Sequence, residues 1–185
     1  HVLPGSRVLS FGTAGCDLAC RFCQNWEIST ARSMTAVGVP AMPRDIAHDA
    51  SARGCSAVAF TYNDPVVFAE YAMDTARAVN EQQMLSIAVT AGYINPEPRD
   101  EFFACMDAAN IDLKGFTEGF YRRITGGRLD VVLDTIDAVV HNGRTWVELT
   151  TLLIPGMNDS DEELRAMCGW IVRQLGPDVP LHFTA

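Results

Sequence analysis

Three cysteines in one short stretch form the densest group of metal-binding side chains in the sequence. Cys16, Cys20 and Cys23 follow the spacing CxxxCxxC. Structural zinc normally takes four ligands, often from two separated pairs, and a [4Fe–4S] cube held entirely by cysteines also takes four. The other three cysteines of the chain are single and far apart. Three thiolates on one loop therefore favour a [4Fe–4S] cube in which one iron is left open for another ligand.

Two other interpretations of these cysteines stay open. They could be reduced thiols packed near a turn, although the loop also contains Asp17 and Arg21 and does not resemble a core segment. They could also bind zinc, with His48 or His182 as the fourth ligand. The spacing favours the iron–sulfur interpretation over both.

The composition of the chain limits the partners and the compartment that can be expected for this loop. The 185 residues carry 14 Lys+Arg against 23 Asp+Glu, a net charge of −9, and 48% are hydrophobic. That supports one domain with a real core and argues against nucleic acid or anionic lipid as a partner. No apolar run approaches the roughly 20 residues of a membrane helix, and residues 1–7 do not resemble a signal peptide. We expect a cytoplasmic protein whose thiols stay reduced rather than a disulfide scaffold.

Short apolar runs alternate with helical patterns along the chain. Strands are expected at 7–13, 56–62, 84–90, 110–113, 146–154 and 180–184, and helices at 44–53, from Pro65 onward, and at 97–108, 129–142 and 160–174. This alternation indicates an α/β fold of parallel β-α units. Six units of roughly 30 residues fill the chain, whereas a full eight-unit barrel needs about 250 residues.

The predicted fold is a partial (β/α)6 TIM-like barrel, with a doubly wound sheet as the rival. In either fold ligands bind at the carboxyl ends of the strands, and the cysteine loop follows the first strand at that end. Because the sequence lacks an initiator Met and stops on the sixth strand, we expect it to be the core of a longer protein, truncated at both ends.

The last helix and the single cysteines receive structural interpretations. Ser160 and Glu163 predict a capping box at the start of helix 160–174. The core face of that helix is predicted to comprise Leu164, Met167, Cys168, Ile171, Val172 and Leu175. The two other single cysteines, Cys55 and Cys105, are likewise assigned to packing.

Residues 15–29 (GCDLACRFCQNWEIS) resemble the cluster loop of radical S-adenosylmethionine (SAM) enzymes. More narrowly, they resemble the radical SAM member of the AmmeMemoRadiSam system, close to the pyruvate formate-lyase activating enzymes. Other stretches agree in order, namely FTYNDP at 60–65, NIDLKGF at 110–116, FYRRITGG at 120–127, ELTTLLIPGMND at 148–159 and PLHF at 180–183. The resemblance covers essentially the whole chain and implies one radical SAM core domain over residues 1–185.

The resemblance implies a cofactor pair and a reaction. In that family three cysteines hold a [4Fe–4S] cluster, and SAM chelates the open iron through its amino and carboxylate groups. One electron then breaks a C–S bond of SAM, and a 5′-deoxyadenosyl radical abstracts hydrogen from the substrate. Cys16, Cys20 and Cys23 match the three ligands, and the partners implied are a reductant such as flavodoxin or ferredoxin and either a protein substrate or the partner proteins of the system.

The resemblance also implies cofactor-binding positions. They are Phe22, Asn63, Asp64, Thr90, Asp112, Lys114, Ile154 and His182. Asn63 and Asp64 stand where many family members have Gly-Gly-Glu, here with the shorter Asp in place of Glu. Asp64 can instead cap the helix that Pro65 begins. Lys114 could neutralise a carboxylate of SAM or substrate if it shares a strand face with Asp112.

Several of these positions have ordinary structural alternatives. A salt bridge at the surface is the usual role of a pair such as Asp112 and Lys114, Thr90 suits a strand for its β-branched side chain alone, and His182 could be a core histidine. At the level of function, the alternatives are an activase acting on a protein Gly, a non-enzymatic iron–sulfur or metal-binding module, and an inactive fragment. A module of that kind needs a fourth ligand, and the sequence offers no convincing cysteine for it.

Overall fold

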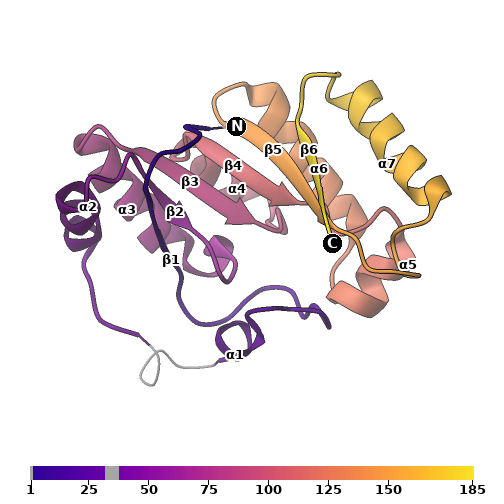
Figure 1. The fold of residues 1–185 in the computed structure, drawn as a ribbon, viewed down its shortest axis with the longest axis horizontal. Coiled ribbons are helices and arrows are strands. Elements are labelled where there is room, and N and C mark those ends of the chain that lie inside the picture. The colour runs from indigo at the N-terminus through magenta and orange to yellow at the C-terminus, as the bar shows by residue number, and fades with distance from the viewer. Residues whose placement is uncertain (1, 32–37) are drawn as a thin grey trace.

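The computed structural model describes residues 2–31 and 38–185, and these residues form one parallel sheet of six strands (Figure 1). The strands are β1 (Val8–Phe11), β2 (Ala57–Phe60), β3 (Leu85–Thr90), β4 (Ala108–Asp112), β5 (Trp146–Leu152) and β6 (Leu181–Thr184). Their order in the sheet equals their order in the sequence, and each pair of neighbours is parallel.

This strand order decides between the two predicted folds. A doubly wound sheet reverses direction at a switch point, whereas here every crossover steps to the next strand on the same side. Because β-α-β crossovers are right-handed, steps in one direction place the connecting helices on one face and curve the sheet like a barrel wall. The partial (β/α)6 barrel is confirmed, and its sheet is open rather than closed, with β1 and β6 as edges.

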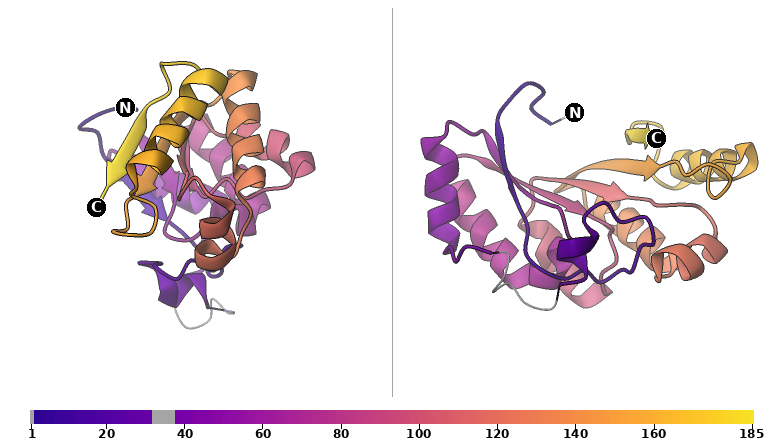
Figure 2. Two further views of the ribbon diagram at one scale, coloured as in Figure 1. Left: turned by 90° about the vertical axis from the view of Figure 1, so that its right-hand side faces the viewer. Right: turned by 60° about the horizontal axis from the view of Figure 1, so that its bottom comes forward.

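The helices lie along one face of the sheet, while the loop that contains α1 crosses the carboxyl ends of the strands (Figures 1 and 2). The helical segments are α1 (Trp26–Ser29), α2 (Pro43–Ala52), η2 (Pro65–Phe68), α3 (Ala69–Glu81), α4 (Pro96–Ala104), α5 (Glu118–Phe120), η3 (Tyr121–Thr125), α6 (Leu129–Asn142) and α7 (Asp161–Gln174). In the described ranges no helix is long and apolar enough to cross a membrane.

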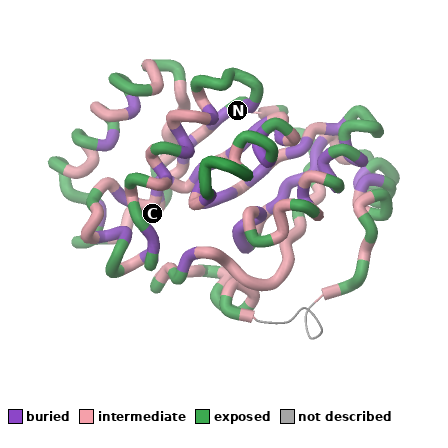
Figure 3. The backbone as a smooth tube through the Cα atoms, turned by 180° about the vertical axis from the view of Figure 1, so that it is seen from behind, coloured by how far each residue is buried: buried purple, intermediate pink, exposed green. Residues whose placement is uncertain are grey.

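The core lies between the sheet and this helical layer, where Figure 3 shows most of the buried backbone. Val58, Phe60, Ile111 and Leu149 from the strands are fully buried there, together with Phe102, Phe103, Val132, Ile136 and Met167 from the helices. In β5 burial alternates, so Val147, Leu149 and Thr151 face the helices while Thr150 and Leu152 face the opposite side. The concave face of the sheet is thereby left to more polar side chains.

Two predicted boundaries lie beyond the ends of their elements, the helix end by four residues and the strand end by two. The helix expected over 97–108 ends at Ala104, because Asp107 turns toward β3 and accepts hydrogen bonds from the backbone N–H and the hydroxyl of Ser86, at 2.8 and 2.9 Å. The strand expected over 146–154 ends at Leu152, since the N–H of Ile154 donates to Asn158 Oδ1 in a turn.

The prediction for α7 is partly wrong. Ser160 caps the helix as expected, accepting from the N–H of Glu163 at 3.2 Å. Glu163 Oε1, however, accepts from the N–H of Phe116 at 2.6 Å, so the side chain ties α7 to the loop after β4 in place of completing a capping box. Cys168 and Val172 are exposed rather than buried, because α7 covers the sheet near its β6 edge and only a narrow stripe around Met167 and Ile171 meets the core.

Candidate functional site

The loop between β1 and α1 carries the three predicted cysteine ligands and is fixed to the protein along its length. Ala19 N–H donates to Thr125 O at 2.8 Å and Arg21 N–H donates to Ile124 O at 2.9 Å, which fastens the loop to η3. Gly15 N–H donates to Ile28 O at 2.9 Å and ties the start of the loop to α1. The loop is therefore held by backbone contacts that do not use the cysteine side chains.

Asn63 joins this loop to the end of β2. Its Oδ1 accepts from Thr13 N–H at 2.9 Å, and its Nδ2 donates to Thr13 Oγ1 at 3.1 Å and to Gly15 O at 2.8 Å. The Asn63 side chain is buried, whereas Thr13 and Gly15 are half-buried, so water has only limited access to these bonds. A Cβ at Gly12 would collide with Thr61 O and with Asn63 Oδ1, so the close approach of the two segments requires glycine at that position.

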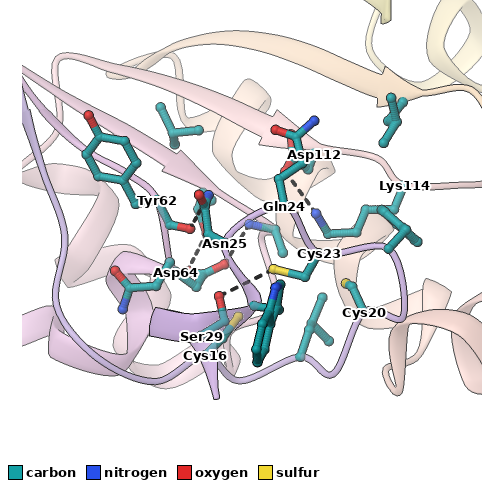
Figure 4. A pocket seen from close by; sticks show the side chains of 18 of the residues that line it. Cys16, Cys20, Cys23, Gln24, Asn25, Ser29, Tyr62, Asp64, Asp112 and Lys114 are labelled. Carbon is teal, nitrogen blue, oxygen red and sulfur yellow. Dashed lines mark hydrogen bonds and ion pairs between the residues drawn. The ribbon is translucent and has the colours of Figure 1, made fainter. Parts of the chain in front are cut away.

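Cys16, Cys20 and Cys23 line a cavity of about 390 Å³ that opens at the carboxyl ends of the strands (Figure 4). All three thiols are free and partly buried. The other walls come from the ends of β2, β3, β4, β5 and β6, through Thr61, Tyr62, Asn63, Asp64, Val89, Thr90, Ala91, Asp112, Lys114, Thr150, Leu152 and Thr184. The parallel topology thus brings the predicted cysteine loop and five strand ends to one place.

Most of the predicted cofactor-binding residues meet in this cavity. Its lining includes Phe22, Asn63, Asp64, Thr90, Asp112 and Lys114. Within the part of the chain that the structure describes, the side chains of Ile154 and His182 lie outside the lining. Ile154 packs against the hydrophobic core, and His182 Nε2 lies 2.6 Å from Glu148 Oε2.

Asp64 caps the helical turn η2, as one of its two predicted roles required. Its Oδ1 accepts from Val66 N–H at 3.1 Å and from the Thr90 hydroxyl at 2.9 Å, and its Oδ2 accepts from Ala91 N–H at 2.7 Å. Burial raises the pKa of this carboxyl, and the three donors act in the opposite direction. Thr90 therefore serves a buried contact between β2 and β3, beyond its preference for strands.

Asp112 and Lys114 form an ion pair on the wall of the cavity, with Nζ and Oδ2 2.9 Å apart. Only 16% of the Lys114 side chain is exposed, so this is not an ordinary surface salt bridge. Burial by itself lowers the pKa of Lys114, but the charge of the Asp112 carboxylate and its hydrogen bond to Lys114, together with the anionic form of Cys20, more than offset that effect and raise the pKa above its ordinary value. The Lys114 ammonium group on the cavity wall is therefore favoured in its protonated form and is paired with Asp112.

Burial favours the protonated forms of the acidic side chains in the cysteine loop. Burial raises the pKa of Cys16 to about 12, with Asp64 and Asp17 adding to the effect, and burial also raises the pKa of Cys20. Asp17 has a pKa raised to about 7 by burial and by Asp64, and among the described residues its Oδ2 has no hydrogen-bond partner. Thiolate formation is thus unfavourable in the loop by itself, and a bound metal centre reverses that by stabilising the anions.

The arrangement of the donors suits a multinuclear cluster better than a single metal ion. In residues 2–31 and 38–185 no three His, Cys, Asp or Glu side chains converge on one metal position. A mononuclear zinc site needs that convergence, whereas the cysteines of a cube each bind a different iron atom. His48 is exposed on α2, and neither His48 nor His182 lines the cavity. Neither histidine considered as a fourth zinc ligand stands at the cavity, and the number of cysteines suits a [4Fe–4S] cluster with one open iron.

The cavity includes residues that the sequence did not single out. Gln24, Asn25, Trp26, Ser29 and Thr30 line the side formed by α1. Ser29 Oγ lies 3.4 Å from Cys23 Sγ, and Asn25 Nδ2 donates to Tyr62 O at 2.8 Å. Tyr62 has a φ of +74°, in the left-handed region that non-glycine residues rarely adopt. No hydrophobic period marks these positions. All of them except Thr30 lie in the stretch 15–29 that resembles the cluster loop, but that resemblance assigned them no role.

Comparison with known proteins gives a consistent result. The model of the radical SAM superfamily matches residues 11–168. An uncharacterized protein of Methanocaldococcus jannaschii is 34% identical over 191 residues, which covers 100% of this chain and 54% of that protein. The 4-hydroxyphenylacetate decarboxylase activating enzyme of Clostridium scatologenes is 32% identical over 108 residues, covering 57% of this chain and 34% of the enzyme. The chain spans about half the length of such curated relatives, or less.

A solved structure shares the fold. Streptococcus suis SuiB bound to precursor peptide SuiA superposes with a TM-score of 0.73 at 12% identity, covering 96% of this chain and 39% of that one. The family match begins at Phe11, the last residue of β1, and includes the cysteine loop and the strands β2 to β5. The chain therefore belongs to the radical SAM superfamily, and the predicted cofactors, a [4Fe–4S] cluster and S-adenosylmethionine, are those that this family binds.

Proposed function

We propose that this chain is the core of a radical SAM enzyme in which Cys16, Cys20 and Cys23 bind one [4Fe–4S] cluster and the cavity binds SAM beside the open iron. The observation that supports this most is the presence of three free thiols from one loop in the wall of a single cavity of about 390 Å³. A cavity of this size accommodates a small organic ligand. Its remaining walls supply the polar groups that orient such a ligand.

When bound, the cluster supplies the electron for reductive cleavage of the SAM sulfonium, which yields a 5′-deoxyadenosyl radical for hydrogen abstraction. The protein contributes binding, orientation and exclusion of competing reactions. Lys114, held by Asp112 at 2.9 Å, would neutralise a carboxylate of SAM or of the substrate. Phe22, whose ring centroid lies 6.1 Å from that of Phe120, would form an apolar wall against SAM.

Asn63 and Asp64 would act chiefly by positioning other groups. The Asn63 amide is already hydrogen-bonded to Thr13 and Gly15, and the Asp64 carboxylate already accepts from three donors. We therefore propose that Asn63 holds the cysteine loop against β2, and that Asp64 fixes the ends of β2 and β3 where they face SAM. Ile154 and His182 would influence the site through neighbouring residues, since both lie outside the cavity lining.

The experiment that tests the proposal is anaerobic reconstitution with iron and sulfide, followed by incubation with SAM and dithionite. We expect about four irons per chain and production of 5′-deoxyadenosine. Cys20→Ala should abolish the cleavage of SAM, whereas the matched variant Cys168→Ala should retain it, because Cys168 is exposed and lies outside the cavity lining. A loaded cluster that does not cleave SAM would contradict the proposal.

The same preparation separates an enzyme from a passive iron–sulfur module. SAM that binds the open iron changes the electron paramagnetic resonance spectrum of the reduced cluster, and a module with a fully ligated cluster shows no such change. The soluble one-electron reductant in this proposal is a flavodoxin or a ferredoxin. Methyl viologen can replace it in the assay without contributing a protein surface.

The second candidate function is the activation of a glycyl-radical enzyme, that is, hydrogen abstraction from a backbone Gly. It is favoured by the 32% identity with the 4-hydroxyphenylacetate decarboxylase activating enzyme of Clostridium scatologenes. The test is to incubate the reconstituted protein, SAM and a reductant with a glycyl-radical enzyme encoded beside it. A glycyl radical signal that depends on Cys20 would establish this function, and SAM cleavage without such a signal would exclude it for that protein.

A further inference from the structure

Lys114 is held on the cavity wall by its backbone as well as by its side chain. Its N–H donates to the Tyr121 hydroxyl at 3.1 Å, and its carbonyl oxygen accepts from Asn158 Nδ2 at 2.8 Å. Tyr121 is the first residue of η3 and Asn158 lies between β5 and α7, so two segments that are far apart in the sequence meet at one residue. Tyr121 and Asn158 are both fully buried.

The Asn158 amide joins the turn after β5 to the end of β4. Besides its bond to Lys114, Nδ2 donates to Leu152 O at 2.9 Å, and Oδ1 accepts from Ile154 N–H at 2.7 Å. All three partners are backbone groups, and Leu152 itself lines the cavity. Asn158 therefore sets the height at which the Lys114 backbone stands relative to the β5 wall.

Tyr121 connects Lys114 to the cysteine loop. The Tyr121 carbonyl oxygen accepts from Thr125 Oγ1 at 2.8 Å and from Gly126 N–H at 2.9 Å. The second bond spans five residues, which is the spacing of a π-helical turn, a feature that is frequent at functional sites. The carbonyl oxygens of Ile124 and Thr125 accept from two N–H groups of the cysteine loop. One turn thus holds that loop by its backbone and Lys114 by the tyrosine hydroxyl.

The position of the Lys114 ammonium group matters to its neighbours in the cavity. Figure 4 shows Lys114 with Asp112 and Cys20 on one side of the cavity. Burial raises the pKa of Cys20, and the charge of Lys114 is the largest effect in the opposite direction. Because Coulomb interactions in a partly buried site fall steeply as charges separate or become hydrated, a displaced ammonium group would interact less with any anionic group bound there.

We propose that Tyr121 and Asn158 are positioning residues for Lys114 and set where its ammonium group meets a carboxylate of SAM. The inference rests on the proposed function, in which Lys114 neutralises such a carboxylate. Asp112 orients the end of the lysine side chain by the ion pair, while the two buried side chains fix the backbone from which the flexible lysine stem extends. Tyr121 and Asn158 both lie outside the cavity lining, so they act through Lys114.

The test measures the dissociation constant for SAM by equilibrium dialysis of the reconstituted protein. Tyr121→Phe removes only the hydroxyl and keeps the buried ring, and we expect it to weaken SAM binding by about fivefold, as the loss of one hydrogen bond would. The matched control is Tyr71→Phe, which removes a hydroxyl that donates to Ala41 O at 2.8 Å and lies outside the cavity lining. This control should bind SAM as the wild type does.

A double-mutant cycle separates positioning of Lys114 from a general structural role. In a Lys114→Met background, Tyr121→Phe should change the SAM affinity by less than about twofold, because the group that it positions is gone. Asn158→Ala, compared in the same two backgrounds, should show the same dependence on Lys114. A tyrosine with a merely structural role would weaken SAM binding equally in both backgrounds, and that result would overturn the inference.

The same measurements distinguish failure of this inference from failure of the proposed function. Iron is measured for every variant and the affinity is expressed per cluster, so that loss of the cluster is not mistaken for loss of SAM binding. If the wild type binds SAM and Tyr121→Phe binds it equally well, the positioning role is overturned and the proposed function stands. If the loaded wild type binds no SAM, the proposed function fails and this inference fails with it.

Discussion

Replacing Asn63 with alanine removes the side chain that joins the cysteine loop to β2. Three hydrogen bonds are lost, to Thr13 N–H, Thr13 Oγ1 and Gly15 O. A buried hydrogen bond contributes about 1 kcal/mol net, and a polar group left unsatisfied costs about 1–3 kcal/mol. Because the loop is only partly buried and water can reach some of these groups, we expect a loss of about 2–3 kcal/mol in the free energy of unfolding.

The control for this experiment is Asn110→Ala. Asn110 is half-buried in β4, and its Oδ1 has no hydrogen-bond partner among the described residues, so the same chemical change there breaks no such bond to the oxygen. Urea unfolding of the apoprotein should show the loss at Asn63, which corresponds to a fall in Tm of about 5–10 °C, and little change at Asn110. An equal effect of both substitutions would refute the assigned role of Asn63.

A loss in the free energy of unfolding does not by itself prove that Asn63 positions the cysteines. We therefore also expect Asn63→Ala to lower the iron bound per chain after reconstitution and to broaden the resonance spectrum of the reduced cluster, since Thr13 and Gly15 set the start of the loop. Asn63→Asp keeps the acceptor for Thr13 N–H but replaces the donor to Gly15 O with a second oxygen. It should therefore restore little, and full rescue by aspartate would contradict the argument.

Three further predictions follow from single contacts. Lys114→Met leaves the Asp112 carboxylate unpaired on the cavity wall, and SAM affinity measured by equilibrium dialysis should weaken by about tenfold, roughly the loss of one charge-assisted bond; unchanged affinity would remove Lys114 from the site. Gly12→Ala forces the end of β1 away from Thr61 and Asn63, and it should lower both the Tm and the iron bound per chain. In the control Gly143→Ala, the added Cβ meets nothing within 4 Å, so the iron content should stay at the wild-type value. Ser160→Ala removes the cap of α7 and should cost about 1 kcal/mol in urea unfolding, with SAM cleavage unaffected.

Local sequence signals determined the elements and the edge of the sheet at which the site lies. Apolar runs at period two and helical stripes require only neighbouring residues, so β3 and α6 lie close to the ranges predicted for them. Gly143 ends α6 in the left-handed conformation, which glycine adopts without a steric penalty. Errors occur where a distant residue intervenes. α4 ends early because Asp107 accepts a hydrogen bond from Ser86 in β3. The capping box of α7 is incomplete because the Glu163 side chain accepts from the N–H of Phe116.

The candidate site also combines features that local sequence predicts with contacts between residues that are distant in the sequence. The spacing of Cys16, Cys20 and Cys23 by itself indicates three ligands on one loop, because ligand spacing within a loop is a local property. The sequence could not show that Asn63 would bond to Thr13 and Gly15, some 50 residues away along the chain, or that Asp64 would be fully engaged by Thr90 and Ala91. These contacts depend on parallel strands placing their carboxyl ends together, and only the tertiary structure determines which polar atoms remain available to a ligand.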